Sequence, residues 1–170
     1  MEGIIVGNVC SLLAMVSDTV SSSRKTARGV LLVQLLSQIF YGVGAIVLKG
    51  YSAAVQNAVS IIRNLEAVRQ TPRKVIQWLC IAAGVGLGLA FNNLGWLGLL
   101  PVAANLVYSL AVFAFPDDEW KLKAAFFINI VMYTIFNFAI WNIVGGITNG
   151  TVAVMTAIFL IKGHKKQKEN

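Results

Sequence analysis

The chain has 170 residues, of which 57% are hydrophobic and 12% are charged, and its formal net charge is +7. Soluble domains carry about 25% charged residues, so this composition excludes an ordinary soluble domain. A helix needs about 20 apolar residues to cross a bilayer, so the chain has room for one compact bundle of seven such helices. Positive charge in the loops of a membrane protein reflects its insertion, so we expect no nucleic-acid partner for the basic residues.

Seven apolar segments predict an all-α polytopic membrane protein, because backbone inside a bilayer must satisfy its own hydrogen bonds. The third and seventh segments are short and polar. Each follows a predicted glycine turn, at Lys49-Gly50-Tyr51 and at Gly145-Gly146. In chain order, we expect transmembrane helices over residues 3–21, 29–48, 52–65, 75–91, 94–115, 123–143 and 147–161.

The basic residues are sorted to one side of these segments, and only Lys49 falls on the other side. Basic loops stay in the cytoplasm during insertion. We therefore expect the N-terminus outside the cell and the C-terminus in the cytoplasm. The residues on the cytoplasmic side are Arg24, Lys25, Arg28, Arg63, Arg69, Arg73, Lys74, Lys121, Lys123, Lys162, Lys165, Lys166 and Lys168.

The order of long helix, glycine turn and short polar helix occurs twice along the chain. A shift of 96 residues places Gly50 on Gly146 and Ser60 on Thr156. This pattern predicts two parallel three-helix repeats, at residues 1–70 and 94–162, joined by a linker helix within residues 71–93. Residues 163–170 form a basic cytoplasmic tail. Transporters built from such repeats bind their substrates near mid-bilayer, between the repeats.

Three stretches carry a resemblance to a known family: residues 55–63 (VQNAVSIIR), residues 98–102 (GLLPV) and residues 135–138 (IFNF) followed by Gly145-Gly146. They resemble the YgjV-type bacterial inner-membrane proteins over most of the chain. The resemblance implies a location in the bacterial cytoplasmic (inner) membrane. The three-one-three helix order is also similar to that of the SWEET and PnuC transporters, which implies their fold, although the Pro-Gln dipeptide typical of SWEET repeats is absent.

Polar residues within the predicted helices indicate a cavity, because such residues are costly in a bilayer and often functional. On the sixth helix they recur every four residues, which places them on one face. Amides and phenols there suit a small polar solute with hydroxyls or a ring. Alternatively, they only hold helices together, at about 0.6–2 kcal/mol for each hydrogen bond. The predicted binding residues are Gln38, Tyr41, Asn57, Asn129, Tyr133, Asn137 and Trp141.

Two further residues are candidates for gating or proton coupling. Asp18 is the acid that lies deepest within a predicted helix, near its cytoplasmic end. It either couples protons to transport or pairs with Arg24, Lys25 or Arg28 at the interface. Pro101 frees a backbone carbonyl in the fifth helix and forms either a hinge or a packing kink.

These features predict a transporter of a small polar solute, of the sugar, nucleoside or vitamin-precursor type, through a cavity between the repeats. The alternative is a membrane subunit that binds substrate for a separate energising partner. An enzyme is not expected, because the predicted helices contain no histidine and no pair of acids. We expect no cofactor and no metal site, since Cys10 and Cys80 lack metal-ligand spacing. The sequence leaves open whether the chain forms a homo-oligomer.

Overall fold

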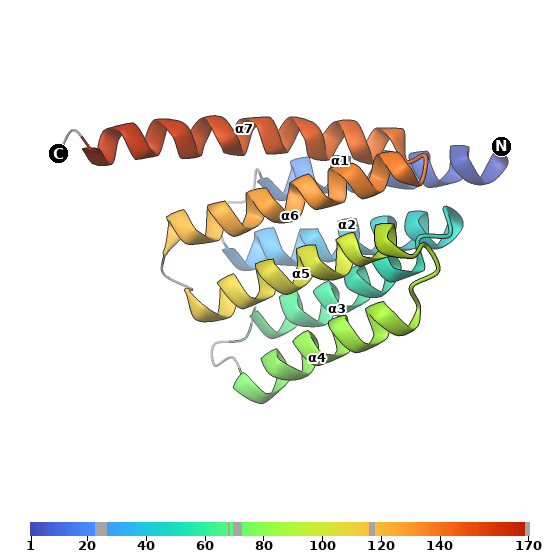
Figure 1. Ribbon diagram of the computed structural model, residues 1–170, viewed down its shortest axis with the longest axis horizontal. Helices are drawn as coiled ribbons and strands as arrows, with labels where there is room; N and C mark the ends of the chain where they lie inside the picture. Colours follow the sequence, from blue (N-terminus) through green and yellow to red (C-terminus); the bar gives the residue numbers. More distant parts are fainter. Residues whose placement is uncertain (23–26, 68, 70–72, 116–117, 169–170) are drawn as a thin grey trace.

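The computed structural model describes residues 1–22, 27–67, 69, 73–115 and 118–168. All seven predicted helices are present, and the part of the chain that the structure describes contains no strand. The helices run alternately in opposite directions, so that α1 and α5 share one direction (Figure 1). They are α1 (Glu2–Ser22), α2 (Ala27–Val47), α3 (Tyr51–Ala67), α4 (Lys74–Ala90), α5 (Trp96–Ala114), α6 (Glu119–Ala139) and α7 (Ile143–Lys168).

The turn between α6 and α7 lies at residues 140–142, so the prediction of a glycine turn at residues 145–146 is wrong. Gly145 and Gly146 lie inside the first turn of α7. A Cβ atom on Gly146 would lie 2.8 Å from the Phe138 ring. This glycine therefore allows a close approach of α6 and α7. A turn and a close helix contact both favour glycine, so the sequence alone did not separate them.

Helix bounds repeat along the chain with a shift of 92 residues. The shift carries the start of α2 to the start of α6 (119 − 27) and the start of α3 to the start of α7 (143 − 51). It also relates Lys49 to Trp141, whose φ angles of 59° and 62° are the positive ones among the described non-glycine residues. The expected shift of 96 residues is wrong, because it paired Gly50 with Gly146, whereas the structure pairs Gly50 with Asn142.

The two related turns have the same hydrogen bonds. The Gly50 N–H donates to the Ala45 carbonyl at 2.7 Å, and the Asn142 N–H donates to the Asn137 carbonyl at 2.9 Å. Each bond spans five residues around one left-handed residue, which is the Schellman end of a helix. The backbone turn after α2 therefore occurs again after α6, although the residues of the two turns differ.

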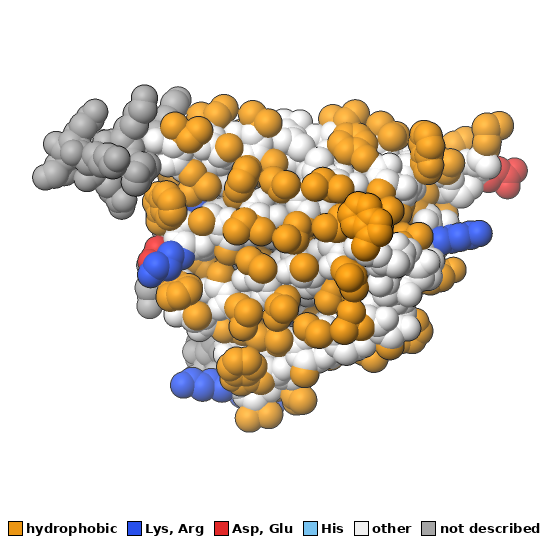
Figure 2. All heavy atoms as spheres, viewed as in Figure 1, with side chains coloured by type: hydrophobic (Ala, Val, Ile, Leu, Met, Phe, Trp, Pro, Cys, Tyr) orange, Lys and Arg blue, Asp and Glu red, His pale blue; other side chains and the backbone are white. Residues whose placement is uncertain are grey.

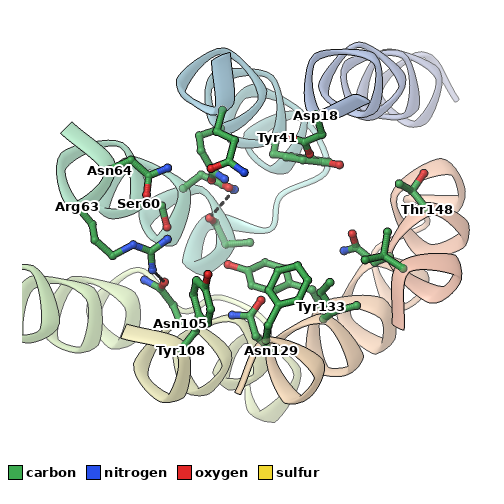
Figure 3. Close-up of a pocket in the computed structure, with 18 of the residues that line it drawn as sticks. Asp18, Tyr41, Ser60, Arg63, Asn64, Asn105, Tyr108, Asn129, Tyr133 and Thr148 are labelled. Atoms are coloured by element: carbon green, nitrogen blue, oxygen red, sulfur yellow. Dashed lines mark hydrogen bonds between the residues drawn. The ribbon is translucent and has the colours of Figure 1, made fainter. Parts of the chain in front are cut away.

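Six helices form a ring, in which α1, α2, α3, α5, α6 and α7 each contact the next and α7 contacts α1. Helix α4 lies outside this ring and contacts α3 and α5 (Figures 1 and 3). Two contacts, α3 with α5 and α1 with α7, join the first three helices to the last three. Among the described residues the backbones of α2 and α6 do not approach each other across the ring, so side chains fill the space between them.

Apolar side chains are spread over the face of the bundle that Figure 2 shows. Trp78 and Val75 on α4, for example, are 64% and 71% exposed. The described helices that are long and apolar enough to cross a membrane are Glu2–Val20, Trp120–Ala139 and Ile143–Ile161. Shorter apolar helices are Leu32–Val47, Lys74–Ala90 and Trp96–Ala111. An exterior of this kind is suited to lipid.

Charged side chains gather at the two ends of the bundle (Figure 2). We call one end the basic end, since Arg69, Arg73, Lys74 and Lys121 lie in or beside its loops, and the other the Lys49 end. Arg24 and Lys25 lie outside the described residues, as do the side chains of Arg28, Lys162, Lys165, Lys166 and Lys168.

A small apolar cluster packs the bundle at the Lys49 end. It contains Ala45, Ala53, Phe136 and Ile140, all of them buried. Gly50 completes it, because a Cβ atom at this position would lie 2.9 Å from the Phe136 ring. Side chains of α2, α3 and α6 therefore pack together at this end.

Candidate functional site

A cavity of about 1100 Å³ occupies the centre of the ring, and all seven helices contribute to its wall (Figure 3). The apolar cluster forms part of its wall at the Lys49 end, where Asn142 also lines it. Towards the basic end its wall includes residues from the last turns of α3 and the first turns of α6, so the cavity extends to that end. Its polar lining residues are Asp18, Thr19, Gln34, Gln38, Tyr41, Asn57, Ser60, Arg63, Asn64, Glu66, Gln77, Asn105, Tyr108, Lys123, Asn129, Tyr133, Asn137, Asn142, Thr148, Asn149 and Thr156.

The structure brings six of the seven predicted binding residues to this one cavity. They come from α2, α3 and α6, which lie on different sides of it (Figure 3). The spacing on α6 placed its three residues on the inner face, as expected for a helix. The six residues are Gln38, Tyr41, Asn57, Asn129, Tyr133 and Asn137.

Trp141 does not belong to the cavity, contrary to the prediction. Helix α6 ends at Ala139, and Trp141 adopts a φ angle of 62° in the turn that follows. The four-residue spacing therefore no longer places this residue on the inner face of α6. The side chain is 65% exposed on the outside of the bundle. An exposed tryptophan near the end of a membrane helix is typical of the lipid–water interface.

The two gating candidates occupy different environments. Asp18 lines the cavity, where the hydroxyls of Ser37 and Tyr41 are its hydrogen-bond partners (Figure 3). Its alternative partners Arg24 and Lys25 lie outside the described residues, as does the side chain of Arg28. Pro101 is fully buried within a continuous α5 and is not part of the cavity wall. A role for either residue in gating stays a prediction.

A chain of hydrogen bonds, missed by the sequence analysis, joins α3, α4 and α5 beside the cavity. Arg63 Nη1 donates to Asn105 Oδ1 at 2.9 Å, and Asn105 Nδ2 donates to Gln56 Oε1 at 2.7 Å. Gln56 Nε2 in turn donates to the Gly84 carbonyl at 2.7 Å. A Cβ atom on Gly84 would lie 3.2 Å from Gln56 Oε1. The absence of a side chain at Gly84 thus gives the Gln56 amide access to the α4 backbone.

Arg63 was counted among the cytoplasmic loop residues, yet its side chain turns into the bundle. Its guanidinium lies 5.2 Å from the centre of the Tyr108 ring, and Nη1 also donates to Ser109 Oγ at 3.2 Å. One signal for this was available. Gln56, Ser60 and Arg63 follow one another at spacings of four and three residues, which places them on one face of α3.

At the Lys49 end, asparagines connect the turn before α7 to its neighbours. Asn142 Nδ2 donates to Asn137 Oδ1 at 3.1 Å, and the Gly145 N–H donates to Asn142 Oδ1 at 3.1 Å. Asn8 accepts from the Val144 N–H at 2.8 Å. The side-chain oxygen of Asn137, a predicted binding residue, therefore has a structural role.

A family model described as a bacterial inner membrane protein, Imp-YgjV, matches residues 5–167. The chain belongs to the YgjV family. It is therefore a bacterial inner-membrane protein, as the resemblance implied. No curated protein and no solved structure matches the chain. The expected similarity to the SWEET and PnuC transporters stays a prediction.

Membership of this family places the apolar sides of the bundle in lipid and the cavity within the membrane. The polar wall is then shielded from lipid by the ring of helices. Among the described residues, no group of three or more His, Cys, Asp or Glu side chains is placed to hold a metal ion. The chemistry available in the wall is hydrogen bonding by amides and hydroxyls, aromatic stacking and the charges of a few side chains.

Proposed function

We propose that this YgjV family member is a membrane transporter of a small polar solute, which it moves through the central cavity. The observation that carries the proposal is a cavity of about 1100 Å³, with many polar side chains in its wall, inside a bundle with an apolar exterior. Small-molecule sites commonly occupy about 300–1,000 Å³, so the space suits a metabolite. Buried polar groups in a membrane are costly, and a transported solute would give these groups partners.

Side-chain chemistry supports a solute with hydroxyls and a ring. Asn57 and Asn129 offer amides that both donate and accept. Tyr41 and Tyr133 offer flat apolar faces with a polar edge. Tyr41 lies on the opposite side of the cavity from Asn129 and Tyr133 (Figure 3). A sugar-like, nucleoside or vitamin-precursor solute would meet both kinds of group at once.

The charge distribution supports an orientation for the proposed transporter. Arg69, Arg73, Lys74 and Lys121 lie at the basic end, and basic loops favour the cytoplasm. The N-terminus would then face outwards and the C-terminus the cytoplasm. In this orientation, the end of the cavity that Glu66 and Lys123 line would face the cytoplasm.

Reconstitution of the purified chain into liposomes tests the proposal. Labelled sugars, nucleosides and vitamin precursors are offered, and uptake is compared with that of empty liposomes. We expect uptake of at least one solute, with a loss of about tenfold or more in Asn57→Ala and Asn129→Ala. Asn93→Ala is the control, because Asn93 lies outside the cavity on an exposed turn. Solute binding without uptake would favour the subunit of an energised complex, and no binding at all would refute the site.

A further inference from the structure

We propose that the solute carries a carboxylate or phosphate group and that the Nε–Nη2 edge of Arg63 binds it. The inference rests on the proposed transport function and names the class of substrate. It starts from the five N–H donors of a guanidinium, which are held in a fixed planar fork.

Among the described residues, hydrogen-bond partners engage only one nitrogen of the Arg63 guanidinium. Nη1 donates to Asn105 Oδ1 at 2.9 Å and to Ser109 Oγ at 3.2 Å. Nε and Nη2 have no partner among the described residues. The buried side-chain atoms without a partner in that part of the chain are the hydroxyls of Ser11 and Ser52. The Nε–Nη2 edge is therefore not sealed within the protein, and Arg63 lines the cavity.

The charge of Arg63 has no counter-charge in the described structure. Glu66 is the nearest acid along α3, but Arg73 Nε lies 3.1 Å from its Oε1 and Arg69 Nη1 lies 3.6 Å from its Oε2. Asp18 lies across the cavity on α1, beside Tyr41 (Figure 3). A cation in a membrane cavity is costly without a partner, and an anionic solute would supply one.

The guanidinium is also held in a fixed orientation. Asn105 positions Nη1, and Gln56, which is 1% exposed, positions Asn105. The Tyr108 ring lies 5.2 Å from the guanidinium carbon, where a ring face attracts a cation. A group fixed before binding loses little entropy when the ligand arrives.

An oxyanion fits this edge better than a neutral group does. Two parallel N–H groups match the two oxygens of a carboxylate or phosphate, and the paired bonds are about twice as strong as neutral ones. The rest of the solute would lie against Tyr108, Asn129 and Tyr133, which surround the same space (Figure 3). Asp18 on the far side disfavours a second negative charge there and suits a hydroxyl or an amine.

Matched pairs of acids and neutral analogues test the inference on the purified full chain in detergent. The probes are lactate with lactamide, benzoate with benzamide, and glucose 6-phosphate with glucose. Thermal shift and calorimetry give the affinity of each probe. We expect at least one acid to bind about tenfold or more tightly than its neutral partner. If the acid binds more tightly only in the two carboxylate pairs, the site recognises a carboxylate. If it binds more tightly only in the phosphate pair, the site recognises a phosphate.

Variants assign the preference to the guanidinium edge. Arg63→Gln should remove the preference, and Arg63→Lys should keep part of it, because lysine retains the charge but lacks the fork. Arg69→Gln is the control, with the same loss of charge on a side chain that is 56% exposed and outside the cavity wall. If Arg63→Gln does not fold, the wild type and Arg63→Lys carry the comparison.

Two results would overturn the inference: neutral probes that bind as tightly as acids, or an unchanged preference in Arg63→Gln. In either case, uptake of a neutral solute by the liposomes would leave the transport proposal standing. Binding of acids that depends on Arg63, without any uptake, would instead refute transport and keep the anion site.

Discussion

Replacing Gln56 with alanine removes the amide that joins three helices beside the cavity. The side chain is 1% exposed, and its two hydrogen bonds, to the Gly84 carbonyl and from Asn105 Nδ2, both measure 2.7 Å. Hydrogen bonds between membrane helices contribute about 0.6–2 kcal/mol each. The loss of two bonds should therefore lower the free energy of unfolding by about 1–4 kcal/mol.

A double-mutant cycle with Asn105→Ala isolates one of these bonds. Because both single variants remove the same Gln56–Asn105 bond, the double variant should cost about 0.6–2 kcal/mol less than the sum of the two. Unfolding is followed by helical circular dichroism while the proportion of a denaturing detergent in mixed micelles is raised. Asn93→Ala serves as the control, since its amide bonds the Lys49 carbonyl on an exposed turn, and it should change stability by less than about 0.5 kcal/mol. Strictly additive effects, or a Gln56→Ala variant as stable as the control, would refute the role assigned to the network.

Three further predictions concern the turns and helix ends. Gly98→Ala should lower the free energy of unfolding by about 1–3 kcal/mol in the same assay, because its Cβ atom would overlap Asn92 Oδ1. Gly86→Ala is the control and should not lower it, because a Cβ atom there meets nothing within 4 Å. Equal effects of the two substitutions would contradict this prediction. Lys49→Gly should stabilise the protein by about 0.5–1 kcal/mol, since the φ angle of 59° favours glycine, and Lys49→Ala should not. The Lys121 backbone N–H and then its side chain hold the pKa of Asp118 below its ordinary value of 3.8. The ionised Asp118 carboxylate therefore stabilises the folded protein above about pH 3.8, and this stabilisation is lost as the pH falls through the lowered pKa. Asp118→Ala should therefore lower the thermal midpoint at pH 7, and its difference from the wild type should shrink towards pH 3; a constant difference would count against the cap.

The seven helices and the membrane location could be predicted because both follow from local features, the length of apolar segments and the position of basic loops. The inner face of α6 followed from the four-residue spacing of Asn129, Tyr133 and Asn137. The same spacing failed at Trp141, because it depends on where the helix ends. The helix ends where Trp141 adopts a positive φ angle. A tryptophan in the sequence does not predict this conformation, because positive φ angles are uncommon for residues other than glycine.

The position of Arg63 depends on residues far along the chain and could not be read locally. An arginine near a helix end can extend outwards to the lipid headgroups or inwards to a cavity. Its partner Asn105 lies 42 residues later, and only the packing of α5 on α3 brings the two together. The hydrogen bond from Gln56 to the Gly84 carbonyl on α4 likewise depends on a tertiary contact.

Two joints of the ring, the contact of α3 with α5 and the contact of α1 with α7, connect its halves α1–α3 and α5–α7. The two joints are held differently. At the joint of α3 with α5, α4 packs across the outside and Asn105 bonds both Gln56 and Arg63. At the joint of α1 with α7, Asn8 bonds the start of α7, and Thr148 Oγ1 donates to Met15 Sδ at 3.3 Å. Separation of the halves would therefore begin between α1 and α7, with α3, α4 and α5 as its axis. Such a movement would open the protein laterally, towards the lipid, on the side of Met15 and Thr148.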